Sequence, residues 1–278
     1  MIVLLTGARG NLGTQLAAVF SRAGHEVIAT ERGELDITDN DAVQRFVAET
    51  KPDCIINAAA YNFVDKVEDP AVYPLAYAVN ALGPKHLAEA AAKAGILFVH
   101  YSTDYVLAGD KPEGYTEDDP TGAPCSKYGE TKAAGERFVR ESGATYFICR
   151  LSKIFGPAGM SDVSKPSFVS LMELRIVHEE VGMPTYTKDV AETTLWMVEH
   201  DVAPGVYHVV NEGKPVTMFE YAEEVFALTG TTTPRVPVPS SAFPRPAKAP
   251  KFAALVNTKL PKLRSRSDAL ADSIASGL

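Results

Sequence analysis

The chain has 278 residues, of which 46% are hydrophobic and 22% are charged, and its formal net charge is −8. This composition excludes a disordered, collagen-like or coiled-coil protein and predicts one large packed domain, or one domain with a small appendage. The negative charge argues against general binding of nucleic acid or of anionic membranes, although it leaves room for a local basic pocket.

The first 150 residues alternate short apolar runs with longer helical patterns. The predicted strands are Ile2–Thr6, Glu26–Thr30, Cys54–Asn57, Leu97–Tyr101 and Tyr146–Arg150. The predicted helices between them are Leu12–Ala23, Asn40–Thr50, a helix ending near Ala94, and Tyr128–Ser142. Continuously apolar strands that alternate with helices are typical of a parallel sheet covered on both faces. The predicted fold class is therefore α/β, a doubly wound parallel sheet of Rossmann type, with residues 1–150 as a dinucleotide-binding domain.

After Arg150, repeated proline and glycine residues interrupt this pattern. The remaining predicted elements are helices near Ser167–Ile176, Lys188–His200 and Met218–Leu228 and a strand at Val206–Val210. Residues 231–262 are rich in proline and predict extended chain that wraps over a surface. We expect residues 151–278 to form a smaller substrate-binding lobe, discontinuous in part, with segments that return to the first domain.

Cysteine content and terminal sequence bear on the cellular compartment. Cys54, Cys125 and Cys149 are too few for a disulfide framework and show no metal-ligand spacing, so we expect free thiols and no metal. No apolar run reaches the roughly 20 residues of a membrane span. The first residues lack the charged region and the cleavage site of a signal peptide. Cytoplasm is the expected location.

A glycine-rich turn joins the first predicted strand to the first helix. Its glycines follow the spacing GxxGxxG at Gly7, Gly10 and Gly13, and the residues between the last two are Asn11 and Leu12. Glycine permits a tight turn, close approach of a phosphate to the backbone and close packing of helix on strand. The N-terminus of the helix then offers free N–H groups to a pyrophosphate. The turn therefore predicts a dinucleotide site rather than a merely tight connection.

Charged residues after the second strand bear on which nicotinamide cofactor binds. Glu31 can bind the adenosine ribose hydroxyls, whereas the guanidinium of Arg32 or Arg9 can hold a 2′-phosphate. The prediction is NADPH or NADH, with NADPH favoured. An alternative of comparable weight is that Glu31 and Arg32 are a solvent-exposed surface pair with no role in cofactor binding.

Two further segments are expected to touch the cofactor. Asp36 and Ile37 lie where an adenine could be clamped, with Asp36 accepting from its amino group. Small residues follow the third strand at Ala58, Ala59 and Ala60, and they would let a cofactor lie against the strand end. Plain close packing of a helix on the sheet would require the same small residues.

Polar residues gather at the end of the fourth strand and at the start of the following helix. Tyr128 and Lys132 are four residues apart and therefore share one helical face. A free tyrosine has a pKa of about 10, and a nearby ammonium lowers it, which suits proton exchange with a carbonyl oxygen. Thr103 ends the strand and could orient that oxygen. YxxxK alone is common by chance, but its combination with the glycine turn and the strand-end hydroxyl is far more specific.

These features together resemble the extended short-chain dehydrogenase/reductases, and within them the dTDP-4-dehydrorhamnose reductase family. The stretches that carry the resemblance are 56–68, 79–84, 102–106, 128–136, 182–186, 205–208 and 245–246. The resemblance implies an NAD(P)H-dependent reductase of the C4 ketone of a nucleoside-diphosphate 4-keto-6-deoxysugar. It implies Tyr128 as proton donor, Lys132 as pKa modifier and ribose ligand, Thr103 helped by Asp104 as the group that polarises the ketone, and Asn80 as a supporting residue of the cofactor site.

The chain departs from the family pattern in three places. Lys153 stands where the family usually carries a tryptophan that packs on the sugar, and residues 175–181 form a shorter bridge than in the family. The family motif Asp-Tyr-Val-Phe-Asp-Gly reads Asp-Tyr-Val-Leu-Ala-Gly at 104–109. We therefore expect retained chemistry with altered sugar specificity, with Lys153 and Arg245 as substrate-binding residues.

Two alternatives stay open. An epimerase or dehydratase of the same superfamily would show no net oxidation of its cofactor, and a regulatory subunit would bind nucleotide without turnover. No glutamate follows Asp104, which argues against a dehydratase, and the intact set of Thr103, Tyr128 and Lys132 argues against a regulatory subunit. The expected partners are a nucleotide-sugar substrate and, on base rates alone, a second copy in a homodimer, with no nucleic acid and no membrane.

Overall fold

A parallel sheet forms the centre of the protein. The computed structural model describes residues 1–157, 159 and 174–276. Six strands pair in the order β2-β1-β3-β4-β5-β10, all in parallel. Their bounds are β1 (Ile2–Thr6), β2 (Glu26–Thr30), β3 (Cys54–Asn57), β4 (Leu97–Thr103), β5 (Thr145–Leu151) and β10 (Gly205–His208). The predicted doubly wound α/β class is confirmed.

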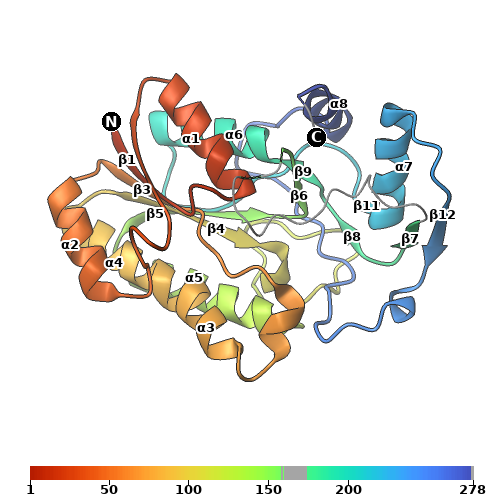
Figure 1. Ribbon diagram of the computed structural model, residues 1–278, viewed down its shortest axis with the longest axis horizontal. Helices are drawn as coiled ribbons and strands as arrows, with labels where there is room; N and C mark the ends of the chain where they lie inside the picture. Colours follow the sequence, from red (N-terminus) through yellow and green to blue (C-terminus); the bar gives the residue numbers. More distant parts are fainter. Residues whose placement is uncertain (158, 160–173, 277–278) are drawn as a thin grey trace.

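Helices cover both faces of this sheet (Figure 1). One face carries α1 (Asn11–Arg22) and α6 (Thr187–Glu199), and the other carries α2 (Asn40–Thr50), α4 (Gly83–Ala94) and α5 (Lys127–Glu141), with the short helix α3 (Tyr73–Tyr77) against α5. Each long helix buries an apolar stripe against the strands; in α1 these are the predicted residues Leu12, Leu16, Val19 and Phe20. No helix within the described ranges is long and apolar enough to span a membrane.

The second half of the chain adds a layer of short strand pairs beside the sheet. Two helices of this layer, α7 (Met218–Thr229) and α8 (Arg266–Ala275), lie toward the right of Figure 1. The strand pairs are β6 (Ile154–Phe155) with β9 (Thr185–Tyr186), β8 (Val181–Gly182) with β11 (Val216–Thr217), and β7 (Leu174–Val177) with β12 (Arg235–Val238). Because β10 and α6 join the central sheet, this half returns to the first domain; the boundary at residue 150 stays a prediction.

The helix predicted near Ser167–Ile176 falls mostly outside the described residues. Its described end belongs to β7, so the prediction is wrong there. Leu174 and Ile176 are buried while Arg175 between them is exposed, which is the alternation of a strand. Pairing with β12, distant in sequence, supplies the backbone hydrogen bonds that a local pattern does not reveal.

A buried ion pair fastens α5 to the sheet. Arg150 of β5 donates from Nε and Nη2 to the two carboxylate oxygens of Glu136, each at 2.9 Å. Both side chains are almost wholly buried, and Arg140 adds an outer contact to Glu136 at 2.9 Å. Burial alone would raise the pKa of Glu136, but the hydrogen bonds and charge of Arg150 hold it below its usual value. Glu136 is therefore ionised at neutral pH.

Candidate active site

The strand order places a crevice at the carboxyl ends of β1 and β3. The chain leaves β1 for β2 on one side, while β3 lies on the other side. Ligands of open parallel sheets bind at such a reversal. Gly7 has φ +68°, and a Cβ on it would lie 2.6 Å from the backbone nitrogen of Ala59. The structure thus brings the glycine turn and the segment 58–60 into direct contact.

The other two glycines of the turn have different surroundings. A Cβ on Gly13 would lie 2.1 Å from the carbonyl oxygen of Gly7, so packing of α1 on the turn requires this glycine. A Cβ on Gly10 would meet only the Gly7 oxygen, at 3.4 Å. Gly10 is the N-cap of α1, and among the described residues no side chain caps the helix there. The uncapped N–H groups and the narrow glycine cradle fit a dinucleotide pyrophosphate.

The side chains of Asn11 and Leu12 have different surroundings at this turn. The side-chain oxygen of Asn11 accepts from the N–H of Gly159 at 3.0 Å. Leu12 is buried in the core beneath α1. Only the backbone of Leu12 is therefore suited to contact a phosphate.

We expect Gly10→Ala to weaken binding of NADPH about tenfold, or about 1.4 kcal/mol. The added methyl has room in the protein but stands beside the uncapped N–H groups that a phosphate would approach. Isothermal titration with NADPH measures the effect, and Gly205→Ala is the control, because it adds the same methyl at the amino end of β10, where a Cβ would meet only an ordinary van der Waals contact with the side chain of Tyr207 at 4.0 Å among the described residues. Equal affinities in the two variants would contradict the placement of the pyrophosphate.

Residues after β2 are linked to the glycine turn. Glu31 accepts from the backbone N–H of Arg9 at 2.6 Å. Arg32 donates to Asp36 at 3.1 Å and is largely exposed, as is Arg9. Burial raises the pKa of Asp36, but hydrogen bonds from Thr38 and from Arg32 outweigh it, so the pKa is lowered overall. Two exposed guanidinium groups therefore border a site where the carboxylates already have partners.

Ile37 and Asn80, both predicted near the cofactor, are buried and make their contacts with other residues of the protein. Ile37 is buried beneath α4, where a Cβ on Gly83 would lie 2.5 Å from its side chain. Asn80 is fully buried in a π-helical turn (Ala78–Leu82). Its oxygen accepts from the N–H of Tyr61 at 2.8 Å, and its nitrogen donates to the carbonyl of Tyr61 and to Thr131, each at 3.0 Å. Asn80 thus joins the loop after β3 to α5.

Tyr128 and Lys132 project from the first turns of α5 toward the end of β4. Lys132 donates to the carbonyl oxygen of Tyr101 at 2.6 Å, and burial lowers the pKa of Lys132 to about 8, against the effect of Glu136. Burial also raises the pKa of Tyr128, and Asp104 and Tyr105 raise it further, whereas a hydrogen bond with Thr103 lowers it. The expectation of a lowered phenol pKa is therefore wrong for this structure. Tyr128 is instead a neutral phenol, able to donate a proton.

A buried carboxyl group lies beside this pair. Asp104 receives hydrogen bonds from Thr103 at 3.0 Å and from Ser152 at 2.7 Å. Ser152 in turn accepts from the N–H of Met183 at 3.1 Å. Burial raises the pKa of Asp104, opposed by Lys153 and by the two hydroxyls. The ends of β4 and β5 therefore carry a continuous polar chain that reaches Thr103.

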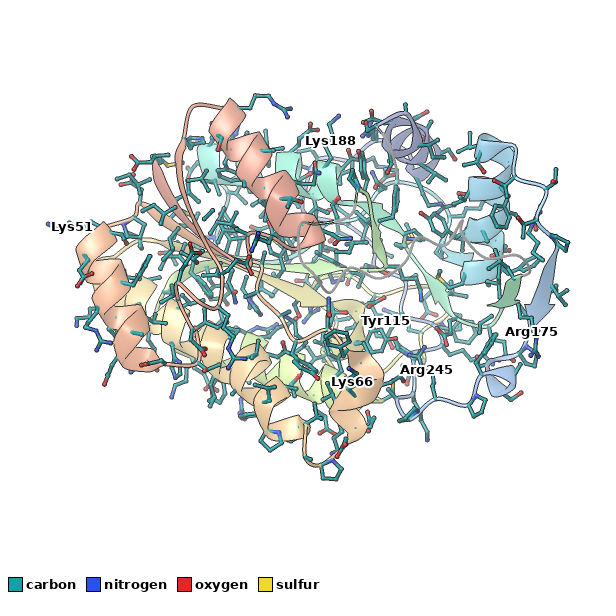
Figure 2. All side chains as sticks on the ribbon, viewed as in Figure 1. Lys51, Lys66, Tyr115, Arg175, Lys188 and Arg245 are labelled. Carbon is teal, nitrogen blue, oxygen red and sulfur yellow. The ribbon has the colours of Figure 1, made fainter. Side chains whose placement is uncertain are left out.

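Lys153 and Arg245 converge on one acidic residue. Glu180 lies 3.8 Å from the ammonium of Lys153 and 3.9 Å from the guanidinium of Arg245. Arg245 also donates to the hydroxyl of Tyr105 at 3.0 Å, and Figure 2 shows it between the sheet and the layer that carries α7. Lys153 has φ +42°, a backbone conformation that is uncommon outside glycine and often occurs at functional sites. These residues border the polar chain.

A cavity of about 420 Å³ lies next to this group. Glu179, Glu180, Phe243, Arg245, Lys248 and Lys251 are among its lining residues. The lining carries three cations against the two carboxylates of Glu179 and Glu180, and this excess of positive charge suits a ligand with phosphate groups. This local charge exists despite the net charge of −8.

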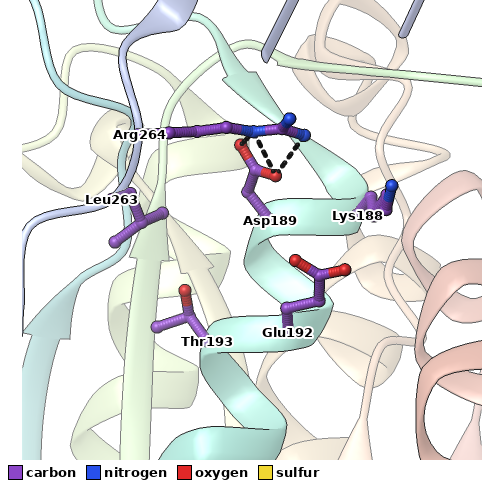
Figure 3. Close-up of a pocket in the computed structure, with 6 residues that line it drawn as sticks. All are labelled: Lys188, Asp189, Glu192, Thr193, Leu263 and Arg264. Atoms are coloured by element: carbon purple, nitrogen blue, oxygen red, sulfur yellow. Dashed lines mark hydrogen bonds and ion pairs between the residues drawn. The ribbon is translucent and has the colours of Figure 1, made fainter. Parts of the chain in front are cut away.

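A second cavity lies between α6 and the C-terminal segment (Figure 3). Arg264 binds Asp189 there with both Nε and Nη2, at distances from 2.7 to 3.0 Å. Lys188 pairs with Asp272, which also binds Arg264. The charges of this cavity thus neutralise one another, and none of the predicted site residues lines it. Among the described residues, this cavity included, no cluster of three or more His, Cys, Asp or Glu could hold a metal.

The sequence did not point to Ser152, Tyr105 or Glu180. Ser152 directly follows β5, and parallel strands bring their carboxyl ends to one edge, so its position was the available signal. Tyr105 lies in the stretch of the family resemblance without an expected role. Glu180 lies in the short bridge and is placed by tertiary contacts that no local pattern indicates.

Comparison with known proteins adds independent findings. The model of the RmlD substrate binding domain matches residues 1–273. A dTDP-4-dehydrorhamnose reductase of Mycolicibacterium smegmatis is 38% identical, with 98% of this chain and 85% of the relative covered. One of Streptomyces griseus is 40% identical, with 91% and 84% covered. The structure of dTDP-4-dehydrorhamnose reductase from Bacillus anthracis in complex with NADP is similar at a TM-score of 0.91 and 32% identity, over 99% of both chains.

Proposed function

The chain belongs to the dTDP-4-dehydrorhamnose reductase family of the extended short-chain dehydrogenase/reductases, and from this membership we propose that it reduces the C4 ketone of dTDP-4-dehydrorhamnose with NAD(P)H. The observation that carries the proposal is the convergence of Tyr128, Lys132 and Thr103 at the end of β4, on the same carboxyl edge of the parallel sheet as the glycine turn after β1. An NAD(P)-dependent oxidoreductase is the function class.

Different residues of the chain bind the cofactor and act on the ketone. The glycine turn and α1 hold the pyrophosphate, with the segment 58–60 against the strand end. Bound NADPH supplies the hydride that the ketone carbon takes up. Tyr128 donates the proton to the ketone oxygen, Lys132 provides a positive charge beside it, and Thr103 orients the oxygen. NADPH is the proposed cofactor, because Arg9 and Arg32 are exposed where a 2′-phosphate would lie.

Turnover tests the function directly. The protein, NADPH and dTDP-4-dehydrorhamnose are mixed, and loss of NADPH absorbance is followed together with formation of the reduced sugar nucleotide. Net oxidation separates a reductase from an epimerase or dehydratase. A raised Tm with nucleotide sugar but no turnover would instead favour a regulatory subunit. Parallel assays with UDP- and GDP-linked 4-keto sugars measure whether this protein, which has Lys153 in place of the family tryptophan, prefers a different sugar nucleotide.

We expect Arg245→Ala to raise KM for the sugar nucleotide about tenfold with a smaller change in kcat, because a charge-assisted hydrogen bond to phosphate is lost. Steady-state kinetics at saturating NADPH measure both constants. Arg22→Ala, an exposed arginine at the end of α1, is the control. An unchanged KM would remove Arg245 from the substrate site.

Location and assembly are also proposed. Three free cysteines, two of them buried, support a reducing compartment such as the cytoplasm. The homodimer rests on base rates, and light scattering of the purified protein tests it.

A further inference from the structure

Tyr105 contacts three groups that serve the proposed reaction. It lies in a short 3₁₀ turn (Asp104–Val106) directly after β4. Its backbone N–H donates to Oγ1 of Thr103 at 3.3 Å, and its ring packs edge-to-face on Tyr128. Its hydroxyl accepts from Nη2 of Arg245 at 3.0 Å. One residue therefore joins the hydroxyl that would orient the ketone, the proton donor and the arginine placed at the substrate site.

The hydroxyl of Tyr105 sets the direction of the Arg245 guanidinium. A guanidinium has donors only, so the phenol oxygen is the acceptor of this hydrogen bond. On the other side of the guanidinium, Nε donates to the carbonyl of Ala247 at 2.9 Å. With these two nitrogens held, Nη1 lies 3.9 Å from Glu180, and both Arg245 and Glu180 line the cavity of about 420 Å³. The arginine thus faces the cavity because Tyr105 and Ala247 hold its other nitrogens.

The segment that carries Arg245 is also anchored independently of Tyr105. The N–H of Ala247 donates to the carboxylate of Asp65 at 3.2 Å, and Asp65 lies 3.5 Å from Nε of Arg245. Two further contacts of this segment with the first domain are Cys125 Sγ to the Lys248 carbonyl at 3.3 Å and the Phe252 N–H to the Gly109 carbonyl at 2.9 Å. Loss of the Tyr105 hydroxyl should therefore leave the segment in place and release only one end of the guanidinium.

The ring and backbone of Tyr105 confine the first turn of α5. Tyr128 is almost wholly buried, and the ring of Tyr105 meets it at an interplanar angle of 80°. A Cβ on Gly129, the next residue of the helix, would lie 2.3 Å from the carbonyl oxygen of Tyr105. The turn after β4 and the start of α5 are therefore in direct backbone contact, and the ring of Tyr105 supports the phenol of Tyr128.

We propose that Tyr105 is a positioning residue whose two parts act at opposite ends of the substrate: its hydroxyl holds Arg245 toward the phosphate groups, and its ring holds Tyr128 toward the ketone. The inference rests on the proposed reductase function. Tyr105 itself exchanges no proton in the reaction. Burial raises its pKa to about 12, against the opposing charge of Arg245, so its hydroxyl is neutral near pH 7. Tyr105 would thus fix the distance between the group that binds phosphate and the group that protonates the ketone.

The first test is Tyr105→Phe, which removes the hydroxyl and keeps the ring. We expect KM for dTDP-4-dehydrorhamnose to rise about fivefold while kcat stays within about twofold, because one hydrogen bond to a charged group is lost and Tyr128 keeps its neighbour. Steady-state kinetics at saturating NADPH measure both constants. Tyr73→Phe is the matched control: it removes a hydroxyl from the same aromatic cluster, and among the described residues no contact joins Tyr73 to Arg245.

A double-variant cycle tests whether the hydroxyl acts through Arg245. In an Arg245→Ala background, Tyr105→Phe should change KM by less than about twofold, because no guanidinium remains for the hydroxyl to hold. Isothermal titration with dTDP repeats the cycle without turnover and should show the same coupling. A full fivefold effect of Tyr105→Phe in the Arg245→Ala background would mean that the hydroxyl contacts the substrate itself, and the positioning role would be wrong.

The role of the ring is tested with Tyr105→Leu and with Tyr105→Met, which fills more of the volume of the ring. We expect both variants to lower kcat about tenfold or more, because the phenol of Tyr128 loses its support. Their affinity for dTDP should equal that of Tyr105→Phe, since only the hydroxyl serves the phosphate end. Tm and affinity for NADPH identify the variants that are folded. A folded variant without the ring but with the kcat of Tyr105→Phe would overturn the role of the ring.

The outcomes separate this inference from the proposed function. Equal KM and equal dTDP affinity in wild type, Tyr73→Phe and Tyr105→Phe would overturn the role of the hydroxyl. A wild type that binds dTDP without reducing the sugar nucleotide contradicts the proposed function, whereas the cycle in dTDP affinity still decides whether Tyr105 positions Arg245. A wild type that does not bind dTDP contradicts both.

Discussion

Tyr128→Phe is expected to lower kcat about a thousandfold, within the range measured for loss of a positioned general acid. The substitution removes the phenolic proton and keeps the ring, which packs edge-to-face on Tyr105 with centroids 5.5 Å apart. Since burial already holds the phenol neutral, the proton is available at neutral pH without a prior ionisation step. Single-turnover measurements with saturating NADPH isolate this step from product release.

The control for Tyr128→Phe is Tyr146→Phe, which removes a hydroxyl from β5 near its amino end. Affinity for NADPH and Tm should match wild type in both variants, because no cofactor-binding backbone moves. If Tyr128→Phe retained wild-type kcat, another group would have to supply the proton and the assignment of roles in this site would be wrong. Loss of NADPH binding in Tyr128→Phe would indicate a structural effect.

Arg150→Leu is expected to lower the free energy of unfolding by about 3–5 kcal/mol, the usual cost of leaving one partner of a buried ion pair uncompensated. Glu136 would remain buried opposite an apolar side chain and would keep the outer contact of Arg140, the hydrogen bond of Ser102 and the more distant charge of Lys132. Urea unfolding at pH 7 with linear extrapolation measures the difference. The double variant Arg150→Leu/Glu136→Leu should recover most of the loss, because it removes the buried charge.

The pH dependence distinguishes charge from packing in this prediction. In wild type, the lowered pKa of Glu136 contributes stability above its unfolded pKa, and this is lost as pH falls through the folded pKa. In Arg150→Leu, burial without the arginine raises the folded pKa, so Glu136 binds a proton more readily in the folded state. The deficit of the variant should therefore shrink as pH falls from 7 toward 5. A deficit independent of pH would assign the effect to lost packing.

Local patterns predicted the parts of the structure that local physics determines. The apolar run Ile2–Thr6, the glycine turn and the helix that begins next to Tyr128 each depend on neighbours in sequence. The strand β7 was predicted as helix because its partner β12 lies far along the chain. Whether such a segment becomes a strand depends on backbone pairing with a distant segment, and local patterns in a single sequence do not show which distant segments pair.

The chemistry of the site was predictable in residue type but not in electrostatics. Tyr128 and Lys132 were identified by their spacing, yet the direction of the phenol pKa depends on burial that only the packed structure has. Lys132 binds a backbone carbonyl, which carries no sequence signal at all. Ser152 reaches Asp104 only because β4 and β5 end in register.

The position of β10 has a consequence for how the protein is made. This strand lies in the second half of the chain, between segments that form the layer of short strand pairs, yet residues 205–208 pair with 147–150 along the outer side of β5. A nascent chain that has emerged only as far as Arg150 therefore presents β5 as an open edge, the kind of surface that recruits strands from other chains. A fragment that ends after the nucleotide-binding half would be prone to aggregate for the same reason. The open edge of β5 is covered by β10 only after synthesis has continued past His208.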